Sequence, residues 1–376
     1  MGDENQQYSD EKQEPMKSEK DPGMKWVIFA DILGAVIIAL LVWAAMIKKT
    51  TDEYEVVEAA TPLYSYSSLS NDVTLPAVES TNYDFDLPLQ PQECSNVSGT
   101  VNMVLITDAN YMDFTRVAIN SAKQNKCPQS VYHVYVMTVD VSDSDIEALK
   151  ALAAADVSIT VLPQRETDLF YIRDTHVSKA SLLKYYIADA LPNLEKVLYL
   201  DSDILVLRDL NALYQTDVQN VYLAAVKDPS WFFENTHVLE LNLEERGFYF
   251  NSGVMLMNLA KFRADGLLQK LEDFTNNNFR TYMDQDALNV VVEKDVLELP
   301  FEANAINFFF EHIYLPTLGH FYGREWKNYV DVFAPVTVLH FASSKKPLGA
   351  EVSHDQFFRM LQRLWYKYYR PLPPLD

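Results

Sequence analysis

Two carboxylates, Asp201 and Asp203, directly follow a short apolar run at residues 197–200, and a second apolar run resumes at residue 204. An unpaired carboxylate inside a hydrophobic core is very costly, so these acids are expected at the exit of a buried strand, beside groups that neutralise them. In an α/β sheet this exit is where ligands bind. Converging carboxylate oxygens suit a hard divalent cation that holds substrate phosphates. The short motif is also compatible with a polar turn between two strands.

The elements that would position these acids alternate between strands and helices. The sequence predicts strands at residues 101–106, 131–138, 157–162 and 197–200, and helices at 114–123, 144–155 and 178–190, the last two begun by Ser144 and Ser178. This alternation indicates a parallel, doubly wound α/β sheet. Asp108 and Asn110 then leave the first strand at the edge where Asp201 and Asp203 leave the fourth. We therefore expect the two acidic turns to meet.

Further polar residues follow later apolar runs. A strand at residues 221–226 precedes Asp228, and the apolar segment 249–257 contains Asn251. Asp284 and Asp286 stand at the start of a predicted helix at 284–292, where acids suit the helix dipole. A strand at 336–341 carries His340. Each of these residues also has a structural interpretation: hydrogen-bonded packing for the buried Asn, helix capping for the acids, and a core position for the histidine.

Composition excludes several classes of protein. The chain has 376 residues and a formal net charge of −22, which argues against a nucleic-acid partner. It has only two cysteines, Cys94 and Cys127, too few for a cysteine zinc site or a disulfide scaffold. Neither a Gly-x-x-x-x-Gly-Lys-Ser/Thr loop nor a Gly-x-Gly-x-x-Gly motif is present, so the two commonest nucleotide cradles are absent.

The N-terminal quarter of the chain differs from the rest. Residues 1–24 are polar and predict a disordered tail, whereas residues 25–49 contain about 20 apolar residues between Trp26 and Lys48, enough to cross a bilayer as a helix. The run is too long for the apolar core of a signal peptide, so it predicts an uncleaved anchor. Four lysines precede the span and two follow it, which favours a cytoplasmic N-terminus: a single-pass type II protein of a Golgi- or ER-like membrane in a eukaryote, or of the inner membrane in a bacterium.

Residues 50–99 predict an acidic stem containing Ser, Thr and Pro, because residues 50–100 include no Lys or Arg. Asn96 begins an Asn-Val-Ser acceptor site for glycosylation if this side is luminal. A catalytic domain is expected at 100–350, followed by a basic, aromatic helix and tail at 351–376. The apolar spacing of that last helix fits packing on the domain, and its basic residues also fit docking on an anionic membrane.

Five segments in order resemble glycosyltransferase family 8, whose members include glycogenin and bacterial lipopolysaccharide galactosyl- and glucosyltransferases. The resemblance covers about residues 101–348. Its segments are TDANY at 107–111, VLYLDSD at 197–203, FNSGVMLMNL at 250–259, DQDALN at 284–289 and HFASSKKP at 340–347. It implies a GT-A fold with a Rossmann-like, mostly parallel sheet. It also implies retaining transfer of a hexose or pentose from a UDP-sugar to a hydroxyl of a glycan, glycolipid or glycoprotein.

The resemblance also implies a role for individual residues. Asp108, Asn110 and Tyr111 are expected to bind the uridine and ribose. Asp201, Asp203 and His340 are the expected ligands of Mn²⁺, with Mg²⁺ as the alternative. The remaining expected contacts to the diphosphate and the donor sugar are Lys184, Ser202, Lys346, Asp228, Asn251, Asp284 and Gln285.

Three positions depart from the family pattern: Lys184 replaces a usual Arg, Ser343 a usual Gly, and Leu348 a Trp that often follows the Lys-Pro pair. A lysine cannot form the bidentate fork of an arginine, so diphosphate or donor-sugar contact there is expected to differ.

The catalytic mechanism stays open between two routes. Double displacement needs a carboxylate nucleophile beside the anomeric carbon, for which Asp228 and Asp284 are candidates. The residue that the resemblance puts there is Gln285, a poor nucleophile, which favours front-face attack. Two other functions also stay open: a membrane-anchored sugar-nucleotide-binding protein with impaired catalysis, and a phosphatase or phosphotransferase that uses Asp201 and Asp203.

The two cysteines flank one predicted strand-helix unit and lie at the same end of it. If the domain faces an oxidising compartment, Cys94 and Cys127 are expected to form a disulfide.

Overall fold

The computed structural model describes residues 89, 91–164, 179–229, 239–241, 243, 248–278, 282–343, 345–348 and 356–373. The predicted tail at 1–24, the predicted span at 25–49, Ser178 and the stem up to residue 88 lie outside these ranges. Among the helices of the described ranges, none is both long enough and apolar enough to span a bilayer.

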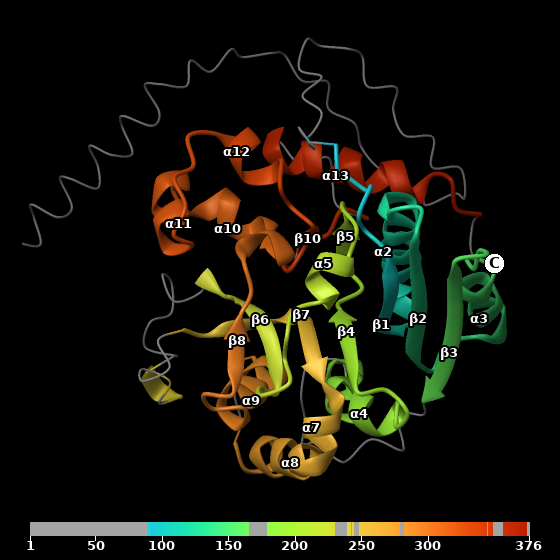
Figure 1. Cartoon of the computed structure of the whole chain (residues 1–376), viewed down its shortest axis with the longest axis vertical. Helices are drawn as coiled ribbons and strands as arrows, with labels where there is room; N and C mark the ends of the chain where they lie inside the picture. The colour runs from blue at the N-terminus through green and yellow to red at the C-terminus, as the bar shows by residue number, and fades with distance from the viewer. Residues whose placement is uncertain are drawn as a thin grey trace, which may run out of the picture. The chain divides into compact units, whose positions relative to one another are not determined.

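A seven-stranded sheet forms the centre of the domain, in the order β3-β2-β1-β4-β7-β6-β8 (Figure 1). Its strands are parallel except for β7, which runs antiparallel to both neighbours. The strands in chain order are β1 Gly99–Asp108, β2 Ser130–Val139, β3 Val157–Gln164, β4 Lys196–Leu200, β6 Leu223–Lys227, β7 Phe250–Asn258 and β8 Val296–Glu298.

The predicted mostly parallel α/β sheet is therefore confirmed, with one strand of opposite direction. The inversion has a functional consequence. Parallel strands bring their carboxyl ends to the active edge of a sheet. β7, running the other way, brings its first residues, Asn251 to Gly253, to that same edge.

Helices cover both faces of the sheet. One face packs against α2, α3 and α5 through a core that includes Leu105 and Ile119. The other packs against 3₁₀ helix η3 and helices α4, α7, α8 and α9 through a core that includes Val104 and Leu183. Their bounds are α2 Met112–Asn125, α3 Asp143–Lys150, η3 Lys179–Tyr186, α4 Ile187–Ala190, α5 Asn211–Tyr214, α7 Leu259–Ala264, α8 Leu267–Asn277 and α9 Met283–Val291.

Two helix predictions need correction. The helix expected at 144–155 is the shorter α3, and it is capped by Ser142 instead of Ser144. Ser142 is extended, with φ −67° and ψ 157°, and its hydroxyl accepts the Asp145 N–H at 3.2 Å, so the helix starts earlier. The helix expected at 178–190 is mostly 3₁₀, with only α4 at its end α-helical.

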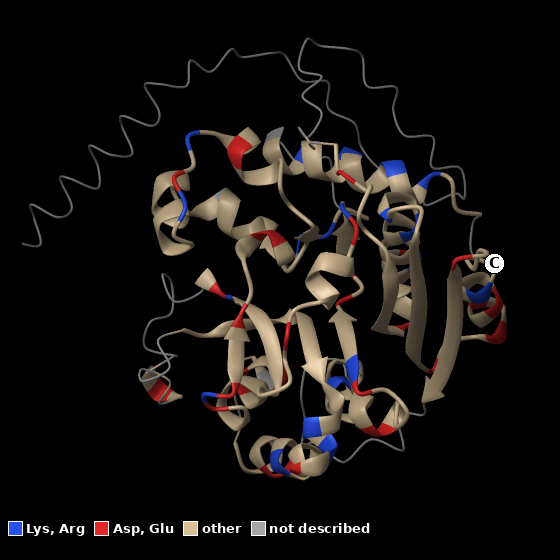
Figure 2. Ribbon diagram, in the orientation of Figure 1, with Lys and Arg blue, Asp and Glu red and all other residues tan. Residues whose placement is uncertain are grey.

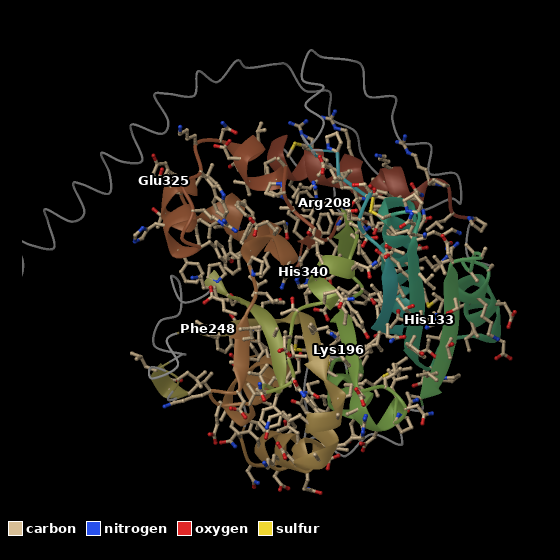
Figure 3. The ribbon with its side chains drawn as sticks, viewed as in Figure 1. His133, Lys196, Arg208, Phe248, Glu325 and His340 are labelled. Carbon is tan, nitrogen blue, oxygen red and sulfur yellow. A yellow bond between two sulfur atoms is a disulfide. The ribbon has the colours of Figure 1, made fainter. Side chains whose placement is uncertain are left out.

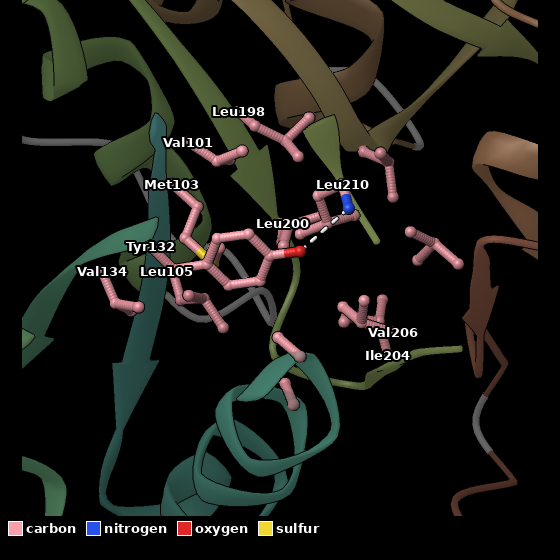
Figure 4. Close-up of a cluster of buried hydrophobic side chains, with 14 of the residues drawn as sticks. Val101, Met103, Leu105, Tyr132, Val134, Leu198, Leu200, Ile204, Val206 and Leu210 are labelled. Carbon is pink, nitrogen blue, oxygen red and sulfur yellow. Dashed lines mark hydrogen bonds between the residues drawn. The ribbon is translucent and has the colours of Figure 1, made fainter. Parts of the chain in front are cut away.

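The core beside β1 also contains Tyr132, a buried tyrosine whose hydroxyl is hydrogen-bonded (Figure 4). The Tyr132 ring lies among Met103, Leu105 and Leu200, and its hydroxyl accepts the Leu210 N–H at 2.9 Å. The same hydroxyl donates to the Asp209 carboxylate at 3.1 Å. Burial raises the pKa of this phenol above its usual value, so it stays protonated.

A second, three-stranded sheet of β5, β10 and β9 lies beyond the carboxyl end of β4 (Figure 1). β10 pairs antiparallel with β5 and parallel with β9, which brings residues about 135 positions apart side by side, as in the His340–Ile204 pair. Around it are β5 Ile204–Val206, η5 Phe301–Ala303, β9 Ala305–Ile306, α10 Asn307–His312, α11 Leu315–Phe321, α12 Tyr329–Phe333, β10 Val338–His340 and α13 Gln356–Tyr369.

Helix α13 packs on the domain, as one of the two interpretations of the C-terminal segment predicted. Its buried side chains include Phe358, Leu361, Trp365 and Tyr368, and the backbone carbonyl of Tyr368 accepts the Asn120 Nδ2 of α2 at 2.7 Å. Basic residues lie along the same helix (Figure 2). Docking of this helix on an anionic membrane stays a prediction.

The predicted disulfide between Cys94 and Cys127 is present, with an S–S distance of 2.06 Å and a Cα–Cα distance of 5.4 Å. It ties the segment before β1 to the end of α2. Gln92 strengthens this attachment, because its Oε1 accepts the Asp209 N–H at 2.7 Å. The end of the predicted stem is therefore fastened to the domain.

Candidate active site

A pocket of about 480 Å³ opens at the carboxyl edge of the main sheet. Its walls come from the ends of β1, β4 and β10, the start of β7, and the start of α9. The lining includes most of the predicted site residues: Asp108, Tyr111, Lys184, Asp201, Ser202, Asp203, Asn251, Asp284, Gln285, His340 and Lys346. The predicted meeting of the two acidic turns is thus confirmed.

Asp201, Asp203 and His340 converge at the base of this pocket. His340 Nε2 lies 3.6 Å from Asp201 Oδ2 and 3.4 Å from Asp203 Oδ1, and one ligand atom of each residue lies within 4.8 Å of the others. His340 is the last residue of β10 in the small sheet, and Figure 3 shows it near the ends of the central strands. Two carboxylates and an imidazole form a donor set that suits a first-row divalent cation such as Mn²⁺.

The backbone beside this group leaves room only for glycine. A Cβ at Gly253 would lie 2.2 Å from His340 Cε1 and 2.7 Å from Asp201 Oδ2. The isolated glycine in β7 therefore permits a close approach of the strand to the ligands. This fit, together with the donor set, makes the three residues a coherent metal-binding group.

Positive charge surrounds the carboxylates. Lys346 Nζ donates to Asp203 Oδ2 and, at 2.7 Å, to the Phe341 carbonyl. Burial works against ionisation of Asp203, but His340, when its ring is protonated, and Lys346 outweigh it and hold the pKa of this carboxyl below its usual value. The carboxylate is consequently ionised at neutral pH and available as a ligand.

Lys184, in η3, lines the pocket and lies buried between two acids. Its Nζ is 2.7 Å from Asp284 Oδ2 and 3.3 Å from Asp201 Oδ1, and it donates to Ser252 Oγ at 3.2 Å. Burial alone would lower the pKa of this ammonium, but Asp201 and Asp284 outweigh burial and raise it. Lys184 therefore stays positively charged and forms ion pairs with both Asp201 of the metal-ligand group and Asp284 at the start of α9.

Amide groups organise the side of the pocket formed by β7 and α9. Gln285 Oε1 accepts from Asn251 Nδ2 at 3.1 Å and from the Ser252 N–H at 3.0 Å. Asp228 Oδ2 accepts from Asn251 Nδ2 at 3.1 Å and from Gln285 Nε2 at 3.3 Å. Asp228 does not line the pocket itself but lies directly behind these two amides.

The residues predicted to bind the nucleoside differ in their placement. Asp108 and Tyr111 line the pocket, and the Asp108 carboxylate also caps 3₁₀ helix η1, Ala109–Tyr111, by accepting two backbone N–H groups. Asn110 is exposed and outside the pocket lining. Ser202 lines the pocket, but its hydroxyl already donates to the Ile106 carbonyl at 2.7 Å and accepts from Thr115 at 2.8 Å.

Sequence reasoning missed four residues of this site: Gly253, Asn304, Tyr199 and Tyr282. The Tyr199 hydroxyl donates to Asp201 Oδ1, and Tyr282 lines the pocket mouth with 37% of its surface exposed. Asn304 is fully buried behind His340. Two of them carried a usable signal, since a glycine interrupts the apolar run 249–257 and an asparagine the apolar run 303–306.

A mostly parallel α/β sheet with this acidic pair and distant histidine at its carboxyl edge defines a GT-A-like glycosyltransferase. The chain belongs to glycosyltransferase family 8, whose family model matches residues 102–348. The family resemblance found in the sequence is confirmed.

Individual proteins agree with this assignment. A putative glycosyltransferase of Haemophilus influenzae is 28% identical over 262 residues, covering 68% of this chain and 76% of that protein. The lipopolysaccharide 1,2-glucosyltransferase of Escherichia coli K12 is 28% identical over 284 residues, covering 73% of this chain and 80% of that protein. The crystal structure of the galactosyltransferase LgtC with donor and acceptor sugar analogues shares the fold, with a TM-score of 0.60, 21% identity, and coverage of 73% and 98% of the two chains.

Proposed function

We propose that this protein transfers a hexose or pentose from a UDP-sugar to a hydroxyl of a glycan, lipid-linked or protein acceptor, with retention of anomeric configuration. The observation that carries the proposal is the pocket, which joins a metal-ligand group at its base to a cluster of amides and carboxylates on one wall. A diphosphate and a sugar ring need these two environments side by side.

The chain's residues suggest how the donor is held. Asp108 and Tyr111 lie beside the metal-ligand group and suit the nucleoside, with the exposed Asn110 at the edge. Asp201, Asp203 and His340 would hold Mn²⁺, with Mg²⁺ as the alternative, and such an ion would neutralise the charge that develops on the departing diphosphate. Lys346, whose ammonium already contacts Asp203, can exchange that contact for a phosphate oxygen.

The wall formed by Asn251 and Gln285, with Asp228 hydrogen-bonded behind them, suits the hydroxyl groups of the donor sugar. Gln285 Oε1 already accepts two hydrogen bonds, and Asp284 is paired with Lys184, so neither is a ready nucleophile. This favours front-face attack over double displacement, because the third candidate, Asp228, lies outside the pocket lining and already accepts hydrogen bonds from Asn251 and Gln285. In front-face attack the acceptor oxygen forms a bond to the anomeric carbon while the bond between that carbon and the phosphate oxygen of UDP breaks. The proton of the acceptor hydroxyl passes to a phosphate oxygen of the departing UDP.

The test is UDP release from a panel of UDP-sugars, with acceptor fragments and Mn²⁺. We expect release with at least one donor, complete loss on chelation, and loss in Asp203→Asn, whose shape is conserved. Asp265→Asn, a substitution on the surface, is the matched control and should retain full rate. Turnover that survives complete chelation contradicts the proposal. Tight UDP-sugar binding without turnover would establish the alternative, a sugar-nucleotide-binding protein with impaired catalysis.

We further propose that residues 25–49 anchor the protein as a single span with its N-terminus in the cytoplasm. The apolar run of about 20 residues suits a bilayer core. The Cys94–Cys127 disulfide supports placement of the catalytic domain on the oxidising side. The full chain should resist alkaline extraction from membranes, and its domain should be shielded from protease added to the cytoplasmic face. Release by alkali, or digestion from the cytoplasmic face, contradicts this topology.

A further inference from the structure

Asn304 connects two parts of the site without lining the pocket. It lies between η5 and β9 and is fully buried. Its Oδ1 is 3.0 Å from His340 Nδ1, and its Nδ2 is 2.8 Å from Asn251 Oδ1. One carboxamide therefore bridges the histidine of the metal-ligand group and the asparagine that contacts Gln285.

The orientation of the Asn251 side-chain amide follows from the backbone N–H of Gly253, which can only donate a hydrogen bond. The Gly253 N–H lies 3.0 Å from one side-chain atom of Asn251, so that atom must be the oxygen. The amino group of Asn251 then faces Asp228 and Gln285, where two acceptors receive it at 3.1 Å. The Ser252 N–H at 3.0 Å independently requires the Gln285 atom at this point to be oxygen.

The same logic continues to the histidine. Because Asn251 Oδ1 accepts, Asn304 must present its amino group there and its oxygen to His340. A carbonyl oxygen cannot donate, so His340 Nδ1 must carry a proton. The lone pair of the neutral ring then lies on Nε2, the atom that faces Asp201 and Asp203 at 3.6 and 3.4 Å.

We propose that Asn304 is a positioning residue that holds neutral His340 as the Nδ1–H tautomer, and that the amide chain through Asn251 couples the metal-ligand group to Gln285. This inference rests on the proposed function for its meaning in catalysis. The tautomer of His340 and the direction of its hydrogen bond to Asn304 can both be measured in the absence of turnover. Groups that orient a ligand histidine in this way typically change metal affinity by 10–100-fold when removed.

The first test needs no variant. Nitrogen-15 spectra of the full chain labelled at histidine, recorded as the pH is raised until the His340 ring is neutral, report which nitrogen keeps its proton. His340→Gln identifies the signal by its loss. A protonated Nδ1 with a bare Nε2 is expected. A protonated Nε2 with a bare Nδ1 overturns the proposal.

Two substitutions then separate the two halves of the chain of amides. Asn304→Ala removes the acceptor from His340, so Mn²⁺ affinity, measured with UDP by the paramagnetic resonance of free Mn²⁺, should weaken 10–100-fold. Asn304→Asp keeps an acceptor for the Nδ1 proton but loses the donor to Asn251. It should retain Mn²⁺ binding yet lower kcat, because Asn251 and Gln285 lose their support.

Asn258→Ala is the matched control, because Asn258 is also a buried asparagine and holds the loop carbonyls of Val218 and Gln219. It should lower thermal stability and leave the His340 spectrum and Mn²⁺ affinity unchanged. Wild-type Mn²⁺ affinity in a folded Asn304→Ala protein overturns the proposal, as does equal loss of Mn²⁺ in the Ala and Asp variants. Absence of UDP-sugar turnover in the wild type, with the expected spectrum, would instead count against the proposed function alone.

Discussion

Gly253 is the residue whose side chain, a single hydrogen, shapes the metal-ligand group. Replacing it with alanine puts a methyl group 2.2 Å from His340 Cε1, a distance that requires the ring or the strand to move. We expect Gly253→Ala to lower both UDP release and Mn²⁺ affinity by about 10-fold or more, because displaced ligands bind metal poorly. Titration with Mn²⁺ and a steady-state assay measure the two effects.

Gly266→Ala provides the contrast. Gly266 has φ +61°, and a Cβ added there would have no neighbour within 4 Å, so alanine strains the backbone by about 1–2 kcal/mol without contacting the site. Its stability should fall and its activity should not. Equal activity in the Gly253→Ala and wild-type proteins would show that the strand can retreat from the ligands.

Lys184 is the buried cation of the site, and its removal leaves Asp201 and Asp284 without their shared partner. Lys184→Met keeps the length of the side chain and should cost about 3–5 kcal/mol in the free energy of unfolding, measured in urea. Lys367→Met, at an exposed position of α13, should change it by less than about 0.5 kcal/mol. A loss under about 1 kcal/mol for Lys184→Met would mean that water screens the pair.

The pH dependence of this contribution follows from the raised pKa of Lys184. Because its pKa is higher in the folded state, protonated Lys184 makes its full contribution to the free energy of unfolding at any pH below the ordinary lysine pKa of about 10.4. That contribution is lost as the pH rises through the folded-state pKa. The difference between wild type and Lys184→Met should therefore stay constant across about pH 6–9.

Some of these residues could be predicted from sequence and others could not. Asp201 and Asp203 break an apolar strand, and parallel topology sends Asp108 to the same edge. His340 was placed there by family resemblance. Asn304 could be noticed because it interrupts an apolar run, but its role could not be assigned, because that role depends on the direction of hydrogen bonds among side chains distant in sequence.

At the level of elements, strand positions were predictable because apolar runs end at polar residues. Strand direction was less so. The apolar run of β7 predicts a buried strand but does not indicate whether that strand is parallel or antiparallel to its neighbours. The pairing with β4 and β6 shows that it is antiparallel to both. The helix expected at 178–190 is a 3₁₀ helix over most of its length, which periodicity alone did not reveal. Local patterns thus identify the elements, and long-range pairing decides their geometry.

Helix α13 is held mainly by its buried aromatic face. Trp365 is fully buried and its ring lies 5.5 Å from the Phe114 ring of α2. Its indole N–H has no hydrogen-bond partner among the residues that the structure describes. We expect Trp365→Ala to cost about 3–5 kcal/mol in the free energy of unfolding, and Trp365→Phe to cost less, since it also removes the unpaired N–H. Denaturant unfolding distinguishes them. If Trp365→Ala and Trp365→Phe lost the same free energy of unfolding, filling the volume of the ring would not be enough, and the indole itself would be required.

At the level of the whole molecule, the Cys94–Cys127 disulfide closes the chain across 33 positions. The double variant Cys94→Ser and Cys127→Ser should lose about 2–4 kcal/mol of stability. Its activity should be retained, because both cysteines lie at the end of the β1–α2 unit opposite the pocket. Wild type treated with reductant should unfold at the same denaturant concentration as the variant. An undiminished stability in the variant would show that the Gln92–Asp209 contact suffices.

The disulfide also determines how the domain carries mechanical load. β1 is bordered by strands on both sides and ends at Asp108, so tension applied at Gly99 would run along the strand to the pocket. With Cys94 bonded to Cys127, a pull arriving from the N-terminal side is transferred to the end of α2 before it reaches β1. The bond therefore directs a force from the N-terminal side towards α2, and away from the strand that ends at Asp108 in the pocket.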